Sequence, residues 1–136
     1  MANLFVDTNV FLRFLTDDDP AKARRAERLF EKAVAGEVML ETSLLVIAEI
    51  VWTLESFYRL AKGDIAEKVS KILNTPNLSC ETSLTILAAL DLYVDANVDF
   101  IDAYHGVLYR RADAPQIVTF DKKHFGRMDW LEVVEP

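Results

Sequence analysis

The sequence predicts a three-layer α/β domain, in which a mostly parallel central sheet has helices on both faces. Short apolar runs alternate with longer stretches whose apolar residues recur at helical spacing. Strands that alternate with helices form crossover units, and these build parallel sheets covered by helices. The chain has 136 residues and contains no repeat, low-complexity segment or linker, so residues 1–136 are expected to form a single domain.

The first predicted strand covers residues 4–6, a short apolar run that stops at Asp7. A second apolar run, residues 10–15, leads to three aspartates and Pro20. These residues indicate the start of a helix, because Asp is a good cap and Pro fits the first turn. Apolar residues then keep helical spacing until Gly36, where the helix is expected to have ended.

The middle of the chain predicts a second strand and two more helices. The strand covers residues 38–41, and Ser43 is positioned to cap a long helix that runs to about Leu60. That helix is apolar on most sides, so we expect it to be largely buried. Asp64, followed three residues later by Glu67, resembles a capping box and predicts the start of the next helix.

The last part of the chain continues the alternation of strands and helices. The expected elements are a strand over residues 78–80, helices over residues 83–93 and 100–111, and strands over residues 117–120 and 131–134.

Composition excludes several classes of protein. The only cysteine is Cys80, so an internal disulfide, a zinc finger and a Cys-x-x-Cys redox pair are ruled out, and a reducing, cytoplasmic location is expected. No apolar run approaches the roughly 18 residues that span a bilayer, and the first residues do not form a secretory signal. The formal net charge of −7 argues against coating of DNA by clustered basic residues.

Five acidic residues stand where the pattern favours an apolar residue or a turn. Asp7 and Asp121 directly follow predicted strands, Glu49 lies inside an apolar helix, and Asp99 and Asp102 begin another helix. In open α/β sheets the ligand crevice lies beyond the carboxyl ends of the strands. We therefore expect Asp7 and Asp121 to emerge together there, with the acids on helices completing the group.

Such a group predicts a metal site, because neighbouring carboxylates repel one another and are costly to bury without a cation. Oxygen ligands without a histidine or cysteine suit Mg²⁺ or Mn²⁺, and these ions can promote hydrolysis of a phosphodiester. Each acid also has a structural alternative: Asp7, Asp99 and Asp121 as caps or turn residues, and Glu49 as the partner of an arginine. His105 and His124 are expected to be packed or exposed rather than to be ligands.

Four motifs, taken in order, resemble those of PIN-domain ribonucleases, and the length and order of the acids look most like VapC toxins. The motifs are Val6-Asp7-Thr8-Asn9, Ala48-Glu49, Asp99-Phe100-Ile101-Asp102-Ala103 and Thr119-Phe120-Asp121-Lys122. The resemblance implies that Asp7, Glu49, Asp102 and Asp121 are the catalytic and metal-binding acids. It also implies that Asp99 is an auxiliary acid, and that Thr8, Asn9 and Thr119 are polar neighbours of the site.

The same resemblance implies a Mg²⁺- or Mn²⁺-dependent endoribonuclease. Such a toxin is neutralised by a cognate, VapB-like antitoxin and usually forms a homodimer. It acts on RNA and has no membrane partner.

Two other functions stay open from the residues themselves. A phosphatase of the haloacid dehalogenase type also begins with an Asp after a buried strand, but it requires a second Asp where this chain has Asn9. A non-catalytic receiver or scaffold domain could bind Mg²⁺ in an acidic pocket, although it would not require Glu49.

A basic helix face is formed by Arg24, Arg25 and Arg28. This face either contacts RNA phosphates or is simply solvated.

Overall fold

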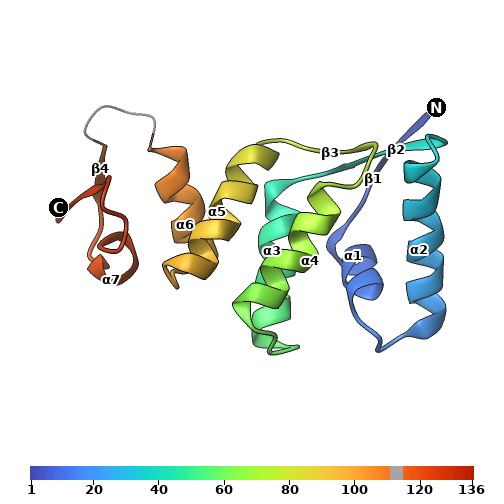
Figure 1. Cartoon of the computed structure of the whole chain (residues 1–136), viewed down its shortest axis with the longest axis horizontal. Coiled ribbons are helices and arrows are strands. Elements are labelled where there is room, and N and C mark those ends of the chain that lie inside the picture. The colour runs from blue at the N-terminus through green and yellow to red at the C-terminus, as the bar shows by residue number, and fades with distance from the viewer. Residues whose placement is uncertain (111–114) are drawn as a thin grey trace. The chain divides into compact units, whose positions relative to one another are not determined.

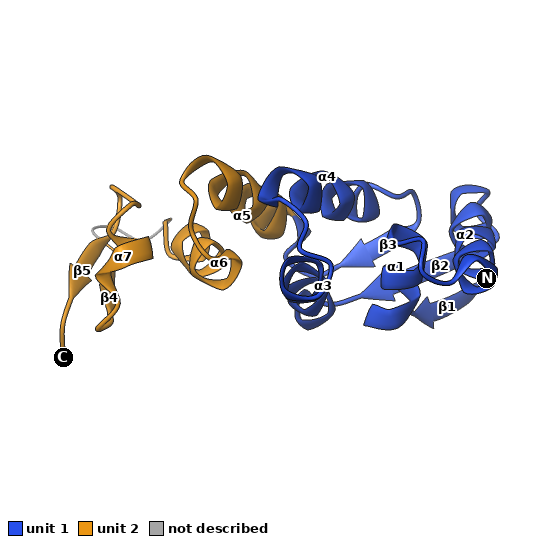
Figure 2. Ribbon diagram, turned by 90° about the horizontal axis from the view of Figure 1, so that it is seen from below, with its two compact units in different colours: residues 1–83 blue, residues 84–136 orange. Residues whose placement is uncertain are grey.

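The computed structural model describes residues 1–110 and 115–136 (Figure 1). It divides into two compact units, residues 1–83 and residues 84–136, which are described one at a time (Figure 2). The predicted end of one helix at Arg111 lies outside the described residues. No helix in the described ranges combines the length and the apolar character needed to cross a membrane.

The first unit contains a three-stranded parallel sheet in the order β1-β2-β3. Ala2 of β1 pairs with Val38 of β2, and Leu40 of β2 pairs with Leu78 of β3. Helix α1 packs against α2 and α3, and α3 packs against α4. The elements are β1 (Ala2–Phe5), α1 (Thr8–Leu15), α2 (Pro20–Val34), β2 (Val38–Thr42), α3 (Leu44–Ser56), α4 (Lys62–Leu73) and β3 (Leu78–Cys80).

Two of the three predicted caps are confirmed in this unit. The Asp19 carboxylate accepts a hydrogen bond from the backbone N–H of Lys22, and the Ser43 hydroxyl accepts one from that of Val46. The predicted capping box at Asp64 is wrong, because α4 begins at Lys62 and its N-cap, Ala61, has no side chain that can accept a hydrogen bond. Asp64 instead lies in the first turn, where a negative charge still favours the helix.

Helix α3 is shorter and less buried than its sequence predicts. It ends at Ser56, and Arg59 adopts a left-handed conformation with φ of 56° that a helix cannot include. One face is buried through residues such as Ile47, Ile50 and Leu54. The opposite face is exposed at Leu45, Glu49, Trp52 and Ser56, so the expectation of a helix buried on most sides is wrong for the face that carries Glu49.

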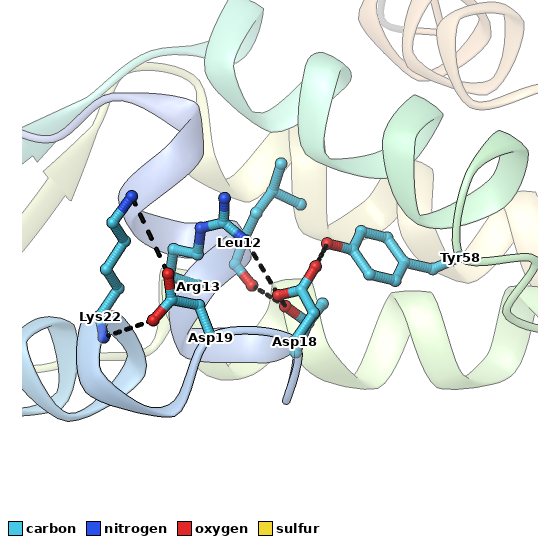
Figure 3. A network of polar contacts seen from close by, with 7 residues as sticks. Leu12, Arg13, Asp18, Asp19, Lys22 and Tyr58 are labelled. Atoms are coloured by element: carbon cyan, nitrogen blue, oxygen red, sulfur yellow. Dashed lines mark hydrogen bonds and ion pairs between the residues drawn. The ribbon is translucent and has the colours of Figure 1, made fainter.

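A polar network joins the turn after α1 to the segment that follows α3 (Figure 3). Asp18 accepts hydrogen bonds from Tyr58 at 2.5 Å, Thr16 at 2.9 Å and Arg13 at 3.0 Å. The hydrogen bond from Tyr58 is the largest cause that lowers the pKa of Asp18 below its ordinary value of 3.8. The same bond raises the pKa of Tyr58 above its ordinary value of 10.0.

The substitution Tyr58→Phe should therefore raise the pKa of Asp18 towards 3.8, because the largest stabilising contact of the carboxylate is lost. A carboxylate with a lowered folded pKa stabilises the fold above its unfolded pKa, and this contribution is lost as the pH falls through the folded pKa. Carboxyl carbon NMR titration of wild type and variant measures the shift directly. An unchanged Asp18 titration in Tyr58→Phe would show that the network is absent in solution.

The second unit contains a two-stranded parallel sheet of β4 and β5, in which Ile117 pairs with Val133. Strand β4 is shorter than the predicted residues 117–120. The backbone of Thr119 still pairs with Val134, but the chain then turns at Thr119 and Asp121. The elements are α5 (Ser83–Asp95), α6 (Phe100–Leu108), β4 (Gln116–Val118), α7 (Lys122–Phe125) and β5 (Glu132–Val134).

A close approach at Gly106 holds α6 against the segment that follows α7. A Cβ atom at Gly106 would lie 2.1 Å from the sulfur of Met128, so no side chain fits there without movement of the methionine. The indole N–H of Trp130 donates a hydrogen bond of 2.9 Å to the carbonyl oxygen of Gly106. Gly106 follows Asp102 by one helical turn, so this contact also fixes the face of α6 that carries Asp102.

The strands of both units pair in parallel and alternate with helices along the chain. The predicted α/β fold with a parallel sheet is thus confirmed.

Candidate functional site

Asp7 lies directly after β1 and Val6, at the N-cap of α1. Its Oδ1 accepts a hydrogen bond of 2.8 Å from the backbone N–H of Thr8, whose side chain is buried. Thr42 of the neighbouring strand donates a hydrogen bond to the carbonyl oxygen of Val6 and holds the chain where it leaves the sheet. The Asp7 side chain is itself exposed, so it can cap the helix and still offer an oxygen to a ligand.

The other predicted acid of this unit, Glu49, lies on the exposed face of α3. Within the described part of this unit, no hydrogen bond or ion pair joins Glu49 to Asp7. Asn9 is also exposed, in the first turn of α1. Unit 1 therefore presents Asp7, Asn9 and Glu49 to solvent on two helices that pack against each other.

The second unit brings two of the predicted acids together and adds a histidine. Ligand atoms of Asp102, Asp121 and His124 all lie within 4.8 Å of one another. Nδ1 of His124 lies 3.0 Å from Oδ2 of Asp102 in a half-buried pair, and each of these side chains is 23% exposed. We call these three residues the Asp102 cluster.

Local hydrogen bonds explain how the segment after β4, the loop and helix α7, carries two members of this cluster. The Thr119 hydroxyl accepts a hydrogen bond of 2.9 Å from the backbone N–H of Asp121. Oδ1 of Asp121 in turn accepts one of 3.0 Å from the backbone N–H of Lys123 and so caps α7. His124 follows Asp121 by three residues, and side chains at this spacing share one face of a helical turn.

Asp99 has a different role from Asp102. It is the N-cap of α6, and its Oδ2 accepts a hydrogen bond of 3.2 Å from the backbone N–H of Ile101. Asp102 lies inside the first turn, as predicted. The structural alternative for Asp99 is thus the one observed, and Asp99 is not among the three residues of the cluster.

The donor set of the Asp102 cluster fits a divalent cation. Two carboxylates supply the hard oxygen ligands that Mg²⁺ and Mn²⁺ prefer. An imidazole nitrogen is a softer ligand, and its affinity for first-row transition metals favours Mn²⁺ over Mg²⁺ at such a site. The expected ligand set contained oxygen atoms only, whereas the group that the structure brings together also includes a nitrogen of His124.

His124 is the site residue that reasoning from the sequence missed. It lacks the two-histidine spacing of a zinc helix, and its aromatic neighbour Phe125 suggested a packing role. The Asp-x-x-His spacing from Asp121 to His124 was the available signal, since it places both side chains on one turn once a helix begins at residue 122.

These observations define a class of protein: a parallel α/β protein with acidic residues at the carboxyl ends of strands and at nearby helix N-termini. The chain belongs to the PIN domain family, whose model matches residues 4–131 and so includes residues of both units. It is 30% identical over 118 residues to a VapC ribonuclease of Aquifex aeolicus (strain VF5), and the match covers 87% of each chain.

A solved structure is also similar, that of VapBC2 from Rickettsia felis bound to a DNA fragment from their promoter. The match covers 100% of this chain and 99% of that one, with 14% sequence identity and a TM-score of 0.39.

Proposed function

We propose that this protein is a metal-dependent endoribonuclease and the toxin of a toxin–antitoxin pair. Membership of the PIN domain family and the similarity to a VapC ribonuclease support the activity. The single observation that carries the proposal from the structure is the Asp102 cluster, which brings two family acids within reach of one cation. The family assignment favours this function over the phosphatase of the haloacid dehalogenase type.

We assign the catalytic and metal-binding roles to four acids, Asp7, Glu49, Asp102 and Asp121. In this proposal Asp102, Asp121 and His124 hold Mg²⁺ or Mn²⁺, and Asp7 and Glu49 serve the same reaction by binding metal or orienting water. Thr119 positions Asp121 through its backbone, and Thr8 positions Asp7. Asp99 caps α6, and Asn9 is available to contact phosphate.

The bound cation would polarise a phosphate oxygen and activate a water molecule. Water, rather than the RNA 2′-hydroxyl, would then attack the phosphorus, and the bond between the phosphorus and the 3′-oxygen would break. The products should carry 5′-phosphate and 3′-hydroxyl ends.

The experiment is incubation of the purified protein with total RNA in Mg²⁺, in Mn²⁺ and in chelator, followed by sequencing of the cleavage ends. Asp102→Asn is the control for a contaminating ribonuclease. Cleavage that needs the metal and leaves 5′-phosphate ends supports the proposal. Cyclic 2′,3′-phosphate ends that are produced by the wild type and not by Asp102→Asn would contradict the mechanism. The same reads identify whether transfer, ribosomal or messenger RNA is cut.

The proposal includes the partners of such a toxin. The protein pairs with a VapB-like antitoxin, forms a homodimer and acts in the cytoplasm. Co-expression with a VapB-like antitoxin, followed by co-purification and light scattering, tests the complex and its stoichiometry.

The substitution His124→Ala should weaken Mn²⁺ binding by more than about 10-fold, because loss of a proposed direct ligand costs at least as much as loss of a residue that only orients one. His105→Ala is the matched control, because His105 is exposed on α6 and lies outside the Asp102 cluster. Titration of free Mn²⁺, followed by its electron paramagnetic resonance signal, measures the affinity without RNA. Equal affinities for the two variants would remove His124 from the site.

A further inference from the structure

Residues of helices α1 and α2 line a basic cavity that is open to solvent and that the proposed catalytic residues do not explain. Its volume is about 430 Å³, and Arg13, Lys22, Arg25 and Asn9 line it together with apolar side chains of both helices. Asn9 follows Asp7, one of the proposed catalytic acids, by two residues. The cavity therefore begins at the helix turn that Asp7 caps.

Two of the three cations are held by acids of the turn between the helices (Figure 3). Nη1 of Arg13 lies 3.0 Å from Oδ1 of Asp18, and Nζ of Lys22 lies 3.9 Å from Oδ2 of Asp19. Asp18 is fixed in turn by Tyr58 and Thr16. These contacts restrain Arg13 and Lys22 at the cavity and leave both with further donors for a ligand.

Arg25 completes the cavity without an acidic partner. Across the residues that the structure describes, it makes no ion pair and no side-chain hydrogen bond. The cavity is lined by three positively charged side chains. The two carboxylates of the turn pair with Arg13 and Lys22, so the charge of Arg25 is left over. A guanidinium is suited to bind phosphate oxygens through two parallel N–H donors.

We propose that this cavity binds the phosphodiester backbone of the RNA substrate, an inference that rests on the proposed ribonuclease function. The chain carries a formal charge of −7, so it repels RNA at long range and requires a local group of cations to hold it. The cavity supplies that group on the helix that Asp7 caps. Single-stranded nucleic acids are commonly held this way, in basic grooves that follow the backbone.

The test measures RNA affinity separately from cleavage. Each variant is made in the Asp102→Asn protein, and binding of a fluorescent single-stranded RNA is followed by anisotropy over a series of salt concentrations. Arg25→Gln should lower the slope of log affinity against log salt by about 0.7 and weaken binding about fivefold at 0.1 M salt, the effect of one lost phosphate contact on a single strand. Arg24→Gln, on the same helix but outside the cavity, should change neither quantity.

A third variant should strengthen binding, and so cannot be explained by misfolding. Asp19→Asn removes the carboxylate that pairs with Lys22 of the cavity, yet asparagine caps a helix as well as aspartate. It should raise RNA affinity, because Lys22 loses its competing partner.

Equal RNA affinities for Arg24→Gln and Arg25→Gln would overturn the proposal. It would also be overturned if Arg25→Gln released an acidic protein partner and left RNA binding unchanged, since the cavity would then belong to that partner. The ribonuclease function has its own readout, cleavage of RNA by the wild type. Its failure is therefore distinguishable from failure at the cavity.

Discussion

The substitution Asp102→Asn should lower the single-turnover rate of RNA cleavage by more than about 100-fold, with little change in the melting temperature. The rate falls because the amide supplies a neutral ligand where the cation requires a carboxylate, and loss of a direct ligand exceeds the 10- to 100-fold effect of residues that only orient ligands. The fold is retained because asparagine has the same shape and can still hydrogen-bond His124. Loss of the charge in the first turn of α6 costs at most about 1 kcal/mol.

Asp99→Asn is the matched control for Asp102→Asn. It removes the same charge from the same helix end, and asparagine replaces aspartate as an N-cap at almost no cost. Cleavage should therefore change little. Rapid-quench assays and melting curves of the two variants decide the assignment, and the opposite order of rates would show that Asp99 is the ligand.

Substitutions of Asp7 should separate its two roles. Asp7→Asn and Asp7→Ala should both lose RNA cleavage by more than about 100-fold, because each removes a charged ligand of the proposed site. Only Asp7→Ala should also lose about 1 kcal/mol of folding stability, since alanine cannot accept the hydrogen bond from the N–H of Thr8.

Urea unfolding in chelator measures the stability of these Asp7 variants without a contribution from bound metal. Addition of Mn²⁺ should then stabilise the wild type more than either variant, because the cation binds the native site by mass action. If Asp7 is a cap and nothing more, Asp7→Asn will keep wild-type activity and wild-type stability in both conditions.

Local signals in the sequence were sufficient to predict most of the helices and strands. Asp19 with Pro20, and Ser43, are side chains whose hydrogen bonds act within three residues, so their effect on a helix start can be predicted without tertiary structure. The strand Leu78–Cys80 was predicted with the observed limits, because turn residues bound a short apolar run.

The errors lie where a non-local contact or an unusual backbone conformation decides the outcome. Helix α3 stops before Leu60 because Arg59 is left-handed, and arginine carries no signal for that conformation. Strand β4 ends at Val118, and the chain turns where the Thr119 hydroxyl accepts a hydrogen bond from the backbone N–H of Asp121. Helix α7 has four residues, too few to show a hydrophobic period.

Part of the candidate site could also be predicted from local signals in the sequence. Asp102 and Asp121 lie together in the structure, as expected from one acid at a helix start and one after a strand. The position of His124 near Asp102 depends on helix α7, which the sequence did not predict. It also depends on the close approach of Gly106 in α6 to Met128, which follows α7. A shared role for Asp7 and Glu49 stays a prediction.

The order of the cluster ligands along the chain has a consequence for the cell that makes the protein. Residues 1–83, with three parallel strands, leave the ribosome first and can begin to fold as a unit. The three residues of the Asp102 cluster lie between residues 102 and 124, so a nascent chain lacks the whole cluster until near the end of translation. If the cluster is the proposed metal site, a stalled or truncated chain that ends before His124 lacks one of its ligands, and such a chain should not cleave RNA beside the ribosome that makes it.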